Sequence, residues 1–360
     1  MPLETLKISR FRNIEAAELN FSPRLNVISG ANAAGKTSLL EAIYFLGRAR
    51  SFRTSHLDRL VQSGAAGFEL FGRVTREGRS SLPVGMARQG RSLRIRMGGE
   101  DVRRLSQLAG RFPFQVVAGD LHKLLEEGPR HRRRFMDWGL FHVEPGYAEQ
   151  WRRYQRALKQ RNAALRSRRP LAQIQAWDPE LVEAGEQLDQ LRRDYLQGLQ
   201  AHLARELATL LPEHAAARLV YRPGLPAGRD LASCLHELAG RDLETGFTRH
   251  GPHRGDFQLR SGDADLLPQL SRGQQKLAVV ALRLAQAALG AELRGYRSLF
   301  LVDDLGAELD AENQHKVLDR LAASGAQVFL TLIDPSALAD RSDTERCMFH
   351  VEHGEVREVV

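Results

Sequence analysis

The stretch Gly30-Ala-Asn-Ala-Ala-Gly-Lys-Thr37 constrains this chain most, because it matches the G-x-x-x-x-G-K-T pattern of a phosphate-binding loop. An apolar run at residues 25–29 precedes it, and a helical pattern at residues 38–46 follows it. In this strand–loop–helix context the loop amides and the helix N-terminus face a phosphate. We expect Lys36 to contact the β- and γ-phosphates and the Thr37 hydroxyl to bind Mg²⁺. The sequence therefore predicts a nucleoside triphosphate site, against the alternative of a chance match in a glycine-containing turn.

A second apolar run, residues 298–302, stops at Asp303 and Asp304. In a parallel sheet the carboxyl ends of the strands lie beside the phosphate loop, so these carboxylates are expected there. Asp303 can then reach Mg²⁺ through its water shell, and Asp304 can polarise the attacking water. The alternative is a strand followed by an ordinary acidic turn. Together with the loop, the pair indicates a nucleotide site.

A third pattern, Leu270-Ser-Arg-Gly-Gln-Gln-Lys276, precedes a helical run at residues 277–286. Ser271 suits the N-cap of that helix, whose free N–H groups attract an anion. An ordinary capped helix is the alternative, but L-S-x-G-Q in this order is more specific.

The rest of the chain alternates between two kinds of pattern. Residues 68–98 hold short alternating runs that predict antiparallel strands, and residues 327–331 predict another strand. Between residues 121 and 211 glycine is scarce and charges recur at helical spacing. We therefore predict an α/β domain assembled from both chain ends, residues 1–125 and 245–360, with an inserted helical arm at residues 126–244.

Positive charge is concentrated in this predicted arm. The chain has a formal net charge of +8, and residues 130–169 alone contain twelve Lys/Arg against three Asp/Glu. Arg152, Arg156 and Lys159 recur at i, i+4 and i+7, so a helix would place them on one stripe. Such a stripe fits phosphate contacts with DNA, although a solvated helix face is the usual alternative. Residues 132–134 could instead pack against the ATPase domain or a partner.

Two further observations concern the compartment. Cys234 and Cys347 lie far apart without metal-ligand spacing, and we expect two small buried apolar side chains. The first residues lack a signal-peptide pattern, and no run approaches the length of a membrane span. The expectation is a cytoplasmic protein without a membrane partner.

The three motifs in this order resemble the ATP-binding cassette superfamily. Residues 270–274 look like its signature motif, and residues 303–304 with Glu308 and Asp310 resemble its Walker B strand and D-loop. In that superfamily the signature of one subunit completes the ATP site of the other. The resemblance therefore implies an ATP-dependent homodimer.

More of the chain resembles the RecF family of bacterial recombination and repair ATPases. The matching stretches lie at residues 11–14, 39–43, 128–138 with 141–145, 250–256 and 302–310. The resemblance implies an ABC/SMC-type head with weak, DNA-stimulated hydrolysis of ATP. It also implies recognition of single-stranded, gapped or junction DNA. With RecO and RecR, such a protein helps RecA to load, supporting replication and the SOS response.

The residues that the resemblance assigns follow the motifs. The nucleotide site comprises Arg12, Asn13, Gly30, Ala31, Asn32, Ala33, Ala34, Gly35, Lys36, Thr37 and Ser38. Thr37 and Asp303 would hold Mg²⁺, with Gln115 as a further ligand or as a structural residue. Asp304 and Lys36 are the catalytic residues. The groups acting across the dimer are Ser271, Arg272, Gly273 and Gln274, with Glu308 and Asp310 along the interface.

Three positions depart from the family pattern. Ala33 stands where many relatives carry glycine, and we expect backbone angles there that suit a Cβ. Asp304 replaces the glutamate usual among transporter cassettes, which indicates slow, switch-like hydrolysis. Thr331 ends a predicted strand at the position where the family pattern would place a switch histidine.

Two alternative functions remain. A transporter cassette would need membrane-domain partners and leaves the basic arm unexplained. An SMC-type DNA-end-processing ATPase should carry a long coiled-coil insertion. Here the segment between Lys36 and Ser271 is too broken by glycine for one.

Overall fold

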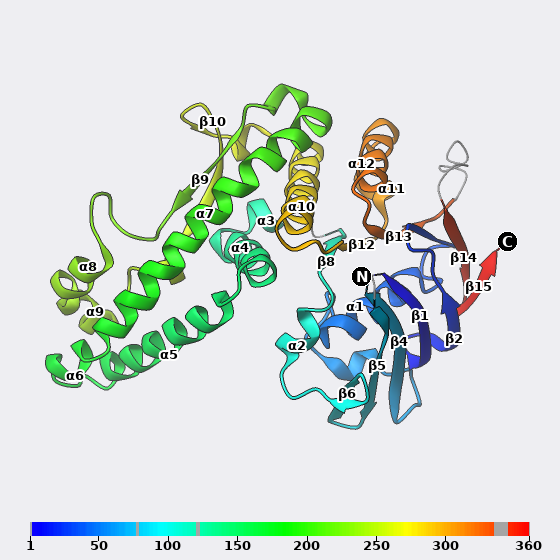
Figure 1. Ribbon diagram of the computed structural model, residues 1–360, viewed down its shortest axis with the longest axis horizontal. Helices are drawn as coiled ribbons and strands as arrows, with labels where there is room; N and C mark the ends of the chain where they lie inside the picture. Colours follow the sequence, from blue (N-terminus) through cyan, green and yellow to red (C-terminus); the bar gives the residue numbers. More distant parts are fainter. Residues whose placement is uncertain (1, 77–78, 120–122, 335–344, 360) are drawn as a thin grey trace. The chain divides into compact units, whose positions relative to one another are not determined.

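The computed structural model describes residues 2–76, 79–119, 123–334 and 345–359. The chain divides into two compact units, residues 1–121 with 290–360 and residues 122–289 (Figure 1). We predicted the domain boundaries from the positions of the sequence motifs, whereas these units are defined by contacts within the structure. The predicted boundaries therefore stay a prediction. Residues 245–289, which we assigned to the head, fall in the second unit.

The first unit contains two sheets and a few helices. Its first segment forms β1 (Leu3–Phe11), β2 (Ile14–Asn20), β3 (Leu25–Ser29), α1 (Lys36–Arg48), η1 (Leu57–Leu60), β4 (Gly67–Arg76), β5 (Arg79–Gln89), β6 (Ser92–Met97), β7 (Glu100–Asp101), α2 (Leu105–Ala109) and β8 (Phe114–Val117). Its second segment forms β12 (Leu299–Val302), α11 (Leu305–Glu308), α12 (Ala311–Ala323), β13 (Gln327–Leu332), β14 (Arg346–Glu352) and β15 (Glu355–Val359).

One sheet joins the two chain ends. Its order is β15-β14-β3-β13-β12-β8, and all neighbours are parallel except the β14–β15 hairpin. Strand β3 therefore lies between two strands from the far end of the chain. This confirms a phosphate-loop domain assembled from both ends, and it brings the ends of β3, β12 and β13 to one edge.

The other sheet is antiparallel, with the order β2-β1-β4-β5-β6-β7. It confirms the antiparallel strands predicted at residues 68–98. On β1, Leu6, Ile8 and Phe11 are all buried although their spacing breaks strict alternation. Arg10 has φ 57, which interrupts the alternation and turns Phe11 inward.

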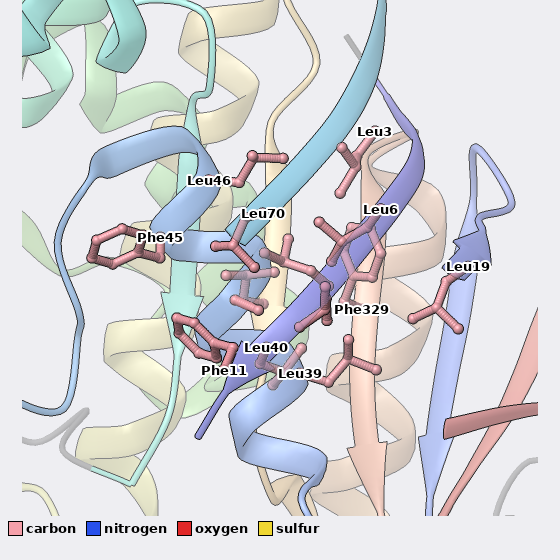
Figure 2. Packing of buried hydrophobic residues seen from close by; sticks show 14 of the residues in the cluster. Leu3, Leu6, Phe11, Leu19, Leu39, Leu40, Phe45, Leu46, Leu70 and Phe329 are labelled. Atoms are coloured by element: carbon pink, nitrogen blue, oxygen red, sulfur yellow. The ribbon is translucent and has the colours of Figure 1, made fainter. Parts of the chain in front are cut away.

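Helix α1 packs against strands of both sheets. Leu39, Leu40, Phe45 and Leu46 lie in one cluster with Leu6 and Phe11 of β1, Leu70 of β4 and Phe329 of β13 (Figure 2). Burying each large apolar side chain contributes about 1.5–3 kcal/mol to stability, so this packing holds α1 in place. The N-terminus of α1, which follows the phosphate loop, is thereby held firmly.

The second unit is mainly helical and includes a small sheet. Its elements are α3 (Lys123–Glu126), α4 (Pro129–Val143), α5 (Tyr147–Arg166), α6 (Leu171–Gln175), α7 (Asp178–Leu210), η2 (Pro212–His214), β9 (Arg218–Arg222), α8 (Leu231–Glu237), α9 (Ala239–Thr245), η3 (Pro252–Arg254), β10 (Asp256–Ser261), β11 (Ala264–Asp265), η4 (Leu267–Gln269) and most of α10 (Arg272–Arg294). The last residues of α10, from Gly290 on, are assigned to the first unit. The two long helices α5 and α7 pack side by side (Figure 1). The sheet β11-β10-β9 was not expected from the sequence.

Buried ion pairs hold the helices of this unit together. Arg161 of α5 is fully buried and donates to Asp178 and Asp242, both at 2.7 Å. Arg192 of α7 is also fully buried and donates to Asp137 at 2.8 Å. Removing one partner of such a pair leaves an uncompensated buried charge, at a cost of about 3–5 kcal/mol. Part of the arginine excess of the arm is therefore structural.

Candidate nucleotide-binding site

The predicted phosphate loop connects β3 to α1 and adopts unusual backbone angles. Gly30 has φ 150 and Gly35 has φ 126, values that favour glycine. A Cβ on Gly30 would lie 2.2 Å from the carbonyl oxygen of Val351, so the strand β14 also excludes a side chain there.

Ala33 differs from our expectation. Its φ is 63, in the left-handed region, where an L-residue is strained by about 1–2 kcal/mol. The geometry of the loop therefore favours glycine at this position, and alanine is held there against its preference. Strain of this kind persists where the surrounding structure determines the conformation.

Lys36 lies over its own loop. Its side chain is buried, and Nζ donates to the carbonyl oxygens of Gly30 at 2.7 Å and Ala31 at 2.9 Å. The ammonium group is thus held inside the curve of the loop, beside the amides that would bind a phosphate.

Two neighbouring turns of the chain support the loop. The carbonyl oxygen of Ala34 accepts hydrogen bonds from Asn13 Nδ2 at 3.0 Å and from the amide of Gly354 at 2.9 Å. The predicted nucleotide-site residue Arg12 donates to both oxygens of Glu41, a buried carboxylate of α1, at 2.7 and 2.9 Å. Arg12 and Asn13 therefore contact the loop and its helix.

The acidic end of β12 lies next to the start of α1. The Thr37 hydroxyl donates to Asp303, with its oxygen 3.0 and 2.9 Å from the two carboxylate oxygens. Thr331 at the end of β13 donates to Asp303 Oδ1 at 2.8 Å and accepts the Asp304 amide at 2.8 Å. Asp304 has φ 50 and is the N-cap residue of the short helix α11. One hydroxyl from β13 thus ties both aspartates to the sheet.

These residues fit Mg²⁺. Magnesium in nucleotide sites usually takes one or two protein oxygens and completes its shell with water and phosphate. Thr37 and Asp303 supply a hydroxyl and a carboxylate in direct contact. Within the described ranges, no group of three or more His, Cys, Asp or Glu side chains could hold a metal ion. An all-protein cage is therefore not found in that part of the chain.

Gln115 occupies a different environment. It is fully buried on β8 and pairs with Phe300, two residues before the Val117–Val302 pair at the strand ends. Two residues correspond to about 7 Å along a strand. This position favours the structural alternative for Gln115 over the ligand.

The predicted D-loop follows the aspartate pair. Asp310 caps α12, accepting the Asn313 amide at 2.9 Å, and this hydrogen bond lowers the pKa of its carboxyl. Glu308 is the last residue of α11, and its side chain lies outside the described residues.

The predicted signature lies in the second unit, at the start of α10. Ser271 Oγ accepts the Gln274 amide at 3.3 Å, and Gln274 Oε1 accepts the Ser271 amide at 2.9 Å. This reciprocal arrangement is a capping box, so the predicted N-cap is confirmed. Ser271 and Arg272 are exposed, and Gly273 and Gln274 are half-buried.

The basic residues of the arm separate into two groups. Arg152, Arg156 and Lys159 are exposed along α5, as the stripe predicts. Arg153 instead binds Glu180 and Glu183. Arg132 donates to Asp256 through two nitrogens, both at 2.8 Å, so it packs inside its own unit.

Comparisons with known proteins give the class and then the family. The chain has 14% identity over its full length and a TM-score of 0.64 with an Smc head bound to the winged-helix domain of ScpA, which shows the fold of an ABC/SMC-type ATPase head. A recombination mediator protein RecF solved with ATP has a TM-score of 0.84 and 26% identity, over 99% of this chain and 97% of that one. The RecF/RecN/SMC N-terminal domain model matches residues 2–356.

Curated relatives agree. The DNA replication and repair proteins RecF of Shewanella piezotolerans and Shewanella oneidensis are each 42% identical over 358 residues, 99% of both chains. The chain belongs to the RecF family, within the RecF/RecN/SMC N-terminal domain class. The resemblance seen in the motifs is confirmed. In the part of the chain that the structure describes, no helix is long and apolar enough to cross a membrane.

Proposed function

We propose that this chain binds ATP with Mg²⁺ and hydrolyses it slowly while acting on DNA in recombinational repair. The observation that carries the proposal is the contact of the Thr37 hydroxyl with the Asp303 carboxylate, 2.9 Å apart, at the start of a phosphate-loop helix. The relatives solved with ATP support the same nucleotide.

Each residue of the site has a separate task. The loop amides and Lys36 bind the phosphates, and Thr37 with Asp303 holds Mg²⁺. The ion would neutralise charge that develops on the transferred phosphate. Asp304 orients and polarises the attacking water. Its short side chain and strained backbone fit slow turnover that acts as a switch.

We further propose that ATP closes a homodimer in which Ser271 and its helix N-terminus face the γ-phosphate of the other subunit. The capping box leaves the remaining amides of the first α10 turn available to an anion. Arg272, Gly273 and Gln274 complete the signature, and Glu308 with Asp310 lines the interface.

DNA is the proposed partner of the dimer. The exposed basic stripe of α5 supports phosphate contacts, and the relatives are named for DNA replication and repair. The specific substrate would be single-stranded, gapped or junction DNA, which stimulates hydrolysis. With RecO and RecR the complex would promote RecA loading in the cytoplasm, supporting replication and the SOS response.

Nucleotide binding by single-site variants tests the proposal. Lys36→Ala should abolish binding of a fluorescent ATP analogue, because the loop loses its cation. Asp304→Asn should bind with unchanged affinity but stall hydrolysis and accumulate the dimer. Wild-type turnover by Asp304→Asn would remove Asp304 from catalysis, and full binding by Lys36→Ala would refute the site itself.

A further inference from the structure

The segment that joins α9 to β10, residues 247–255, is fixed by helices of its own unit. Arg192 of α7 donates to the carbonyl oxygen of Pro252 at 2.5 Å. Arg133 of α4 donates to the carbonyl oxygen of Gly255 at 3.0 Å. We call this segment the 247–255 loop. Its conformation is therefore stabilised by hydrogen bonds from arginines of α7 and α4.

A neutral histidine anchors the same loop. Nε2 of His253 donates to the carbonyl oxygen of Thr248 at 2.9 Å, so Nδ1 accepts from the Tyr154 hydroxyl at 2.6 Å. Burial lowers the pKa of His253 to about 4, and the ring is uncharged near neutral pH. The Thr248 amide also donates to Asn162 of α5 at 2.7 Å.

The residues that this loop presents to solvent are of a different kind. Arg249 and Arg254 are exposed, and Phe247 is 39% exposed. The Arg254 guanidinium lies 5.6 Å from the centre of the Phe247 ring. A rigidly held loop therefore carries two arginines and an accessible aromatic ring.

The C-terminal end of α5 lies against the start of this loop. A Cβ on Gly246 would be 3.4 Å from Arg166 Cγ. The exposed arginines at this helix end are Arg166, Arg168 and Arg169. The neighbouring carboxylates Asp178 and Asp242 are both bound by the buried Arg161. They therefore contribute little to offset the surface charge.

We propose that the 247–255 loop and this end of α5 form a binding surface for single-stranded nucleic acid. Arginine forks match phosphate oxygens, and an exposed aromatic ring can stack with a base. Arg166 follows Lys159 by seven residues, so the stripe on α5 leads to this surface. The proposal rests on DNA binding by the chain. An acidic protein segment would pair with the arginines, but it would not explain the exposed ring of Phe247.

Fluorescence anisotropy with the full chain tests the surface. The probes are a labelled single-stranded oligonucleotide, the matching duplex and a labelled poly-glutamate peptide, over a salt series. The double variant Arg249→Gln/Arg254→Gln should weaken single-strand binding about tenfold, and the log–log salt slope should fall by about 1.4, from two lost phosphate contacts. Phe247→Ala should weaken single-strand binding more than duplex binding, because stacking needs an unpaired base.

Arg193→Gln provides the matched control. Arg193 is also an exposed arginine over an aromatic ring, 5.5 Å from the centre of Tyr221, but its charge is paired with Asp189. The Arg193→Gln variant should leave single-strand binding unchanged, and all variants should bind ATP normally. If the double variant binds DNA like the wild type, the surface is refuted while the proposed function stands. If the double variant loses only peptide binding, the surface binds an acidic protein segment and the nucleic-acid proposal is refuted. A wild type that binds no DNA would refute the proposed function.

Discussion

Thr331 joins the two aspartates at the end of β12 through a single hydroxyl. It is fully buried, accepts the Asp304 amide and donates to Asp303. The sequence showed only that a threonine stands at the position where the family pattern would place a switch histidine. We infer a positioning role for this threonine, because its hydroxyl contacts both the amide of Asp304 and the carboxylate of Asp303.

Replacing this hydroxyl should affect turnover more than folding of the whole head. Thr331→Val keeps the shape but leaves the Asp304 amide unsatisfied, at about 1–3 kcal/mol. We expect hydrolysis to fall about tenfold, equivalent to about 1.4 kcal/mol in the barrier. Thr331→Ser restores the hydroxyl and should keep most of the activity. Equal rates in steady-state assays of the valine and serine variants would remove the positioning role.

His253 makes stability depend on pH in a defined direction. Its pKa is about 4 in the folded chain against 6.5 for the free side chain. Between these values the unfolded chain binds the proton and the folded one does not, so stability falls as pH falls from 6.5 towards 4. The full effect is on the order of 3 kcal/mol. Urea unfolding at pH 7 and pH 5 measures the free energy of unfolding. Between these two pH values it should fall less for His253→Gln than for the wild type. Equal losses would contradict the lowered pKa of His253.

At the scale of elements, helix α5 carries charges with two purposes. Arg161 is bound inside the unit, whereas Arg152, Arg156 and Lys159 face solvent. Charge counting cannot separate the two groups, because the carboxylate partners of Arg161 lie 17 and 81 residues away along the chain. Burial decides which arginines remain available to the DNA that we propose as the partner.

The exposed stripe should therefore set the salt dependence of DNA binding. Replacing Arg152, Arg156 and Lys159 by alanine should lower the log–log slope by up to about three units, roughly one for each phosphate contact. Arg205→Ala removes an exposed arginine of α7 outside the stripe and serves as the control. ATP binding should survive in both variants. An unchanged slope in a titration of duplex DNA would move the contact elsewhere.

The elements around the nucleotide were predictable because their signals are local. The strand at residues 25–29, the helix after the loop and the strand ending at Asp303 follow from apolar runs and glycine spacing. The support of Ala34 by Gly354 was not predictable. It depends on strand order, which brings together segments more than 300 residues apart. The sheet β11-β10-β9 was missed because its alternating runs are short and lie among helices.

At the scale of the molecule, the signature and the phosphate loop belong to different compact units of the chain. In the proposed site the loop binds phosphate with groups of its own, through Lys36 and the backbone amides. Ser271 is exposed at the start of α10, and we propose that it contacts a second subunit there. ATP affinity of the monomer and ATP-dependent dimerisation should therefore respond to different substitutions.

Ser271→Arg separates these two properties. Monomer affinity for ATP should stay nearly intact, because the loop is untouched. Dimerisation with Mg²⁺ and ATP should fail in sedimentation, since a bulky cation enters a tightly packed contact. Ser271→Ala is the control for the lost cap, worth about 1 kcal/mol, and it should still dimerise. The rate of hydrolysis per subunit should rise with protein concentration for the wild type, and it should stay low for Ser271→Arg.

Mixing variants tests whether the site is composite. Lys36→Ala and Ser271→Arg should each be inactive alone. In a mixed dimer one site combines both lesions, and the other combines an intact loop with an intact signature. A mixed dimer should therefore have at most one productive site, because the other site still carries the arginine at position 271 and lacks Lys36. If Ser271→Arg dimerises normally with ATP, or if the wild-type rate of hydrolysis per subunit is independent of protein concentration, the two subunits do not share the ATP.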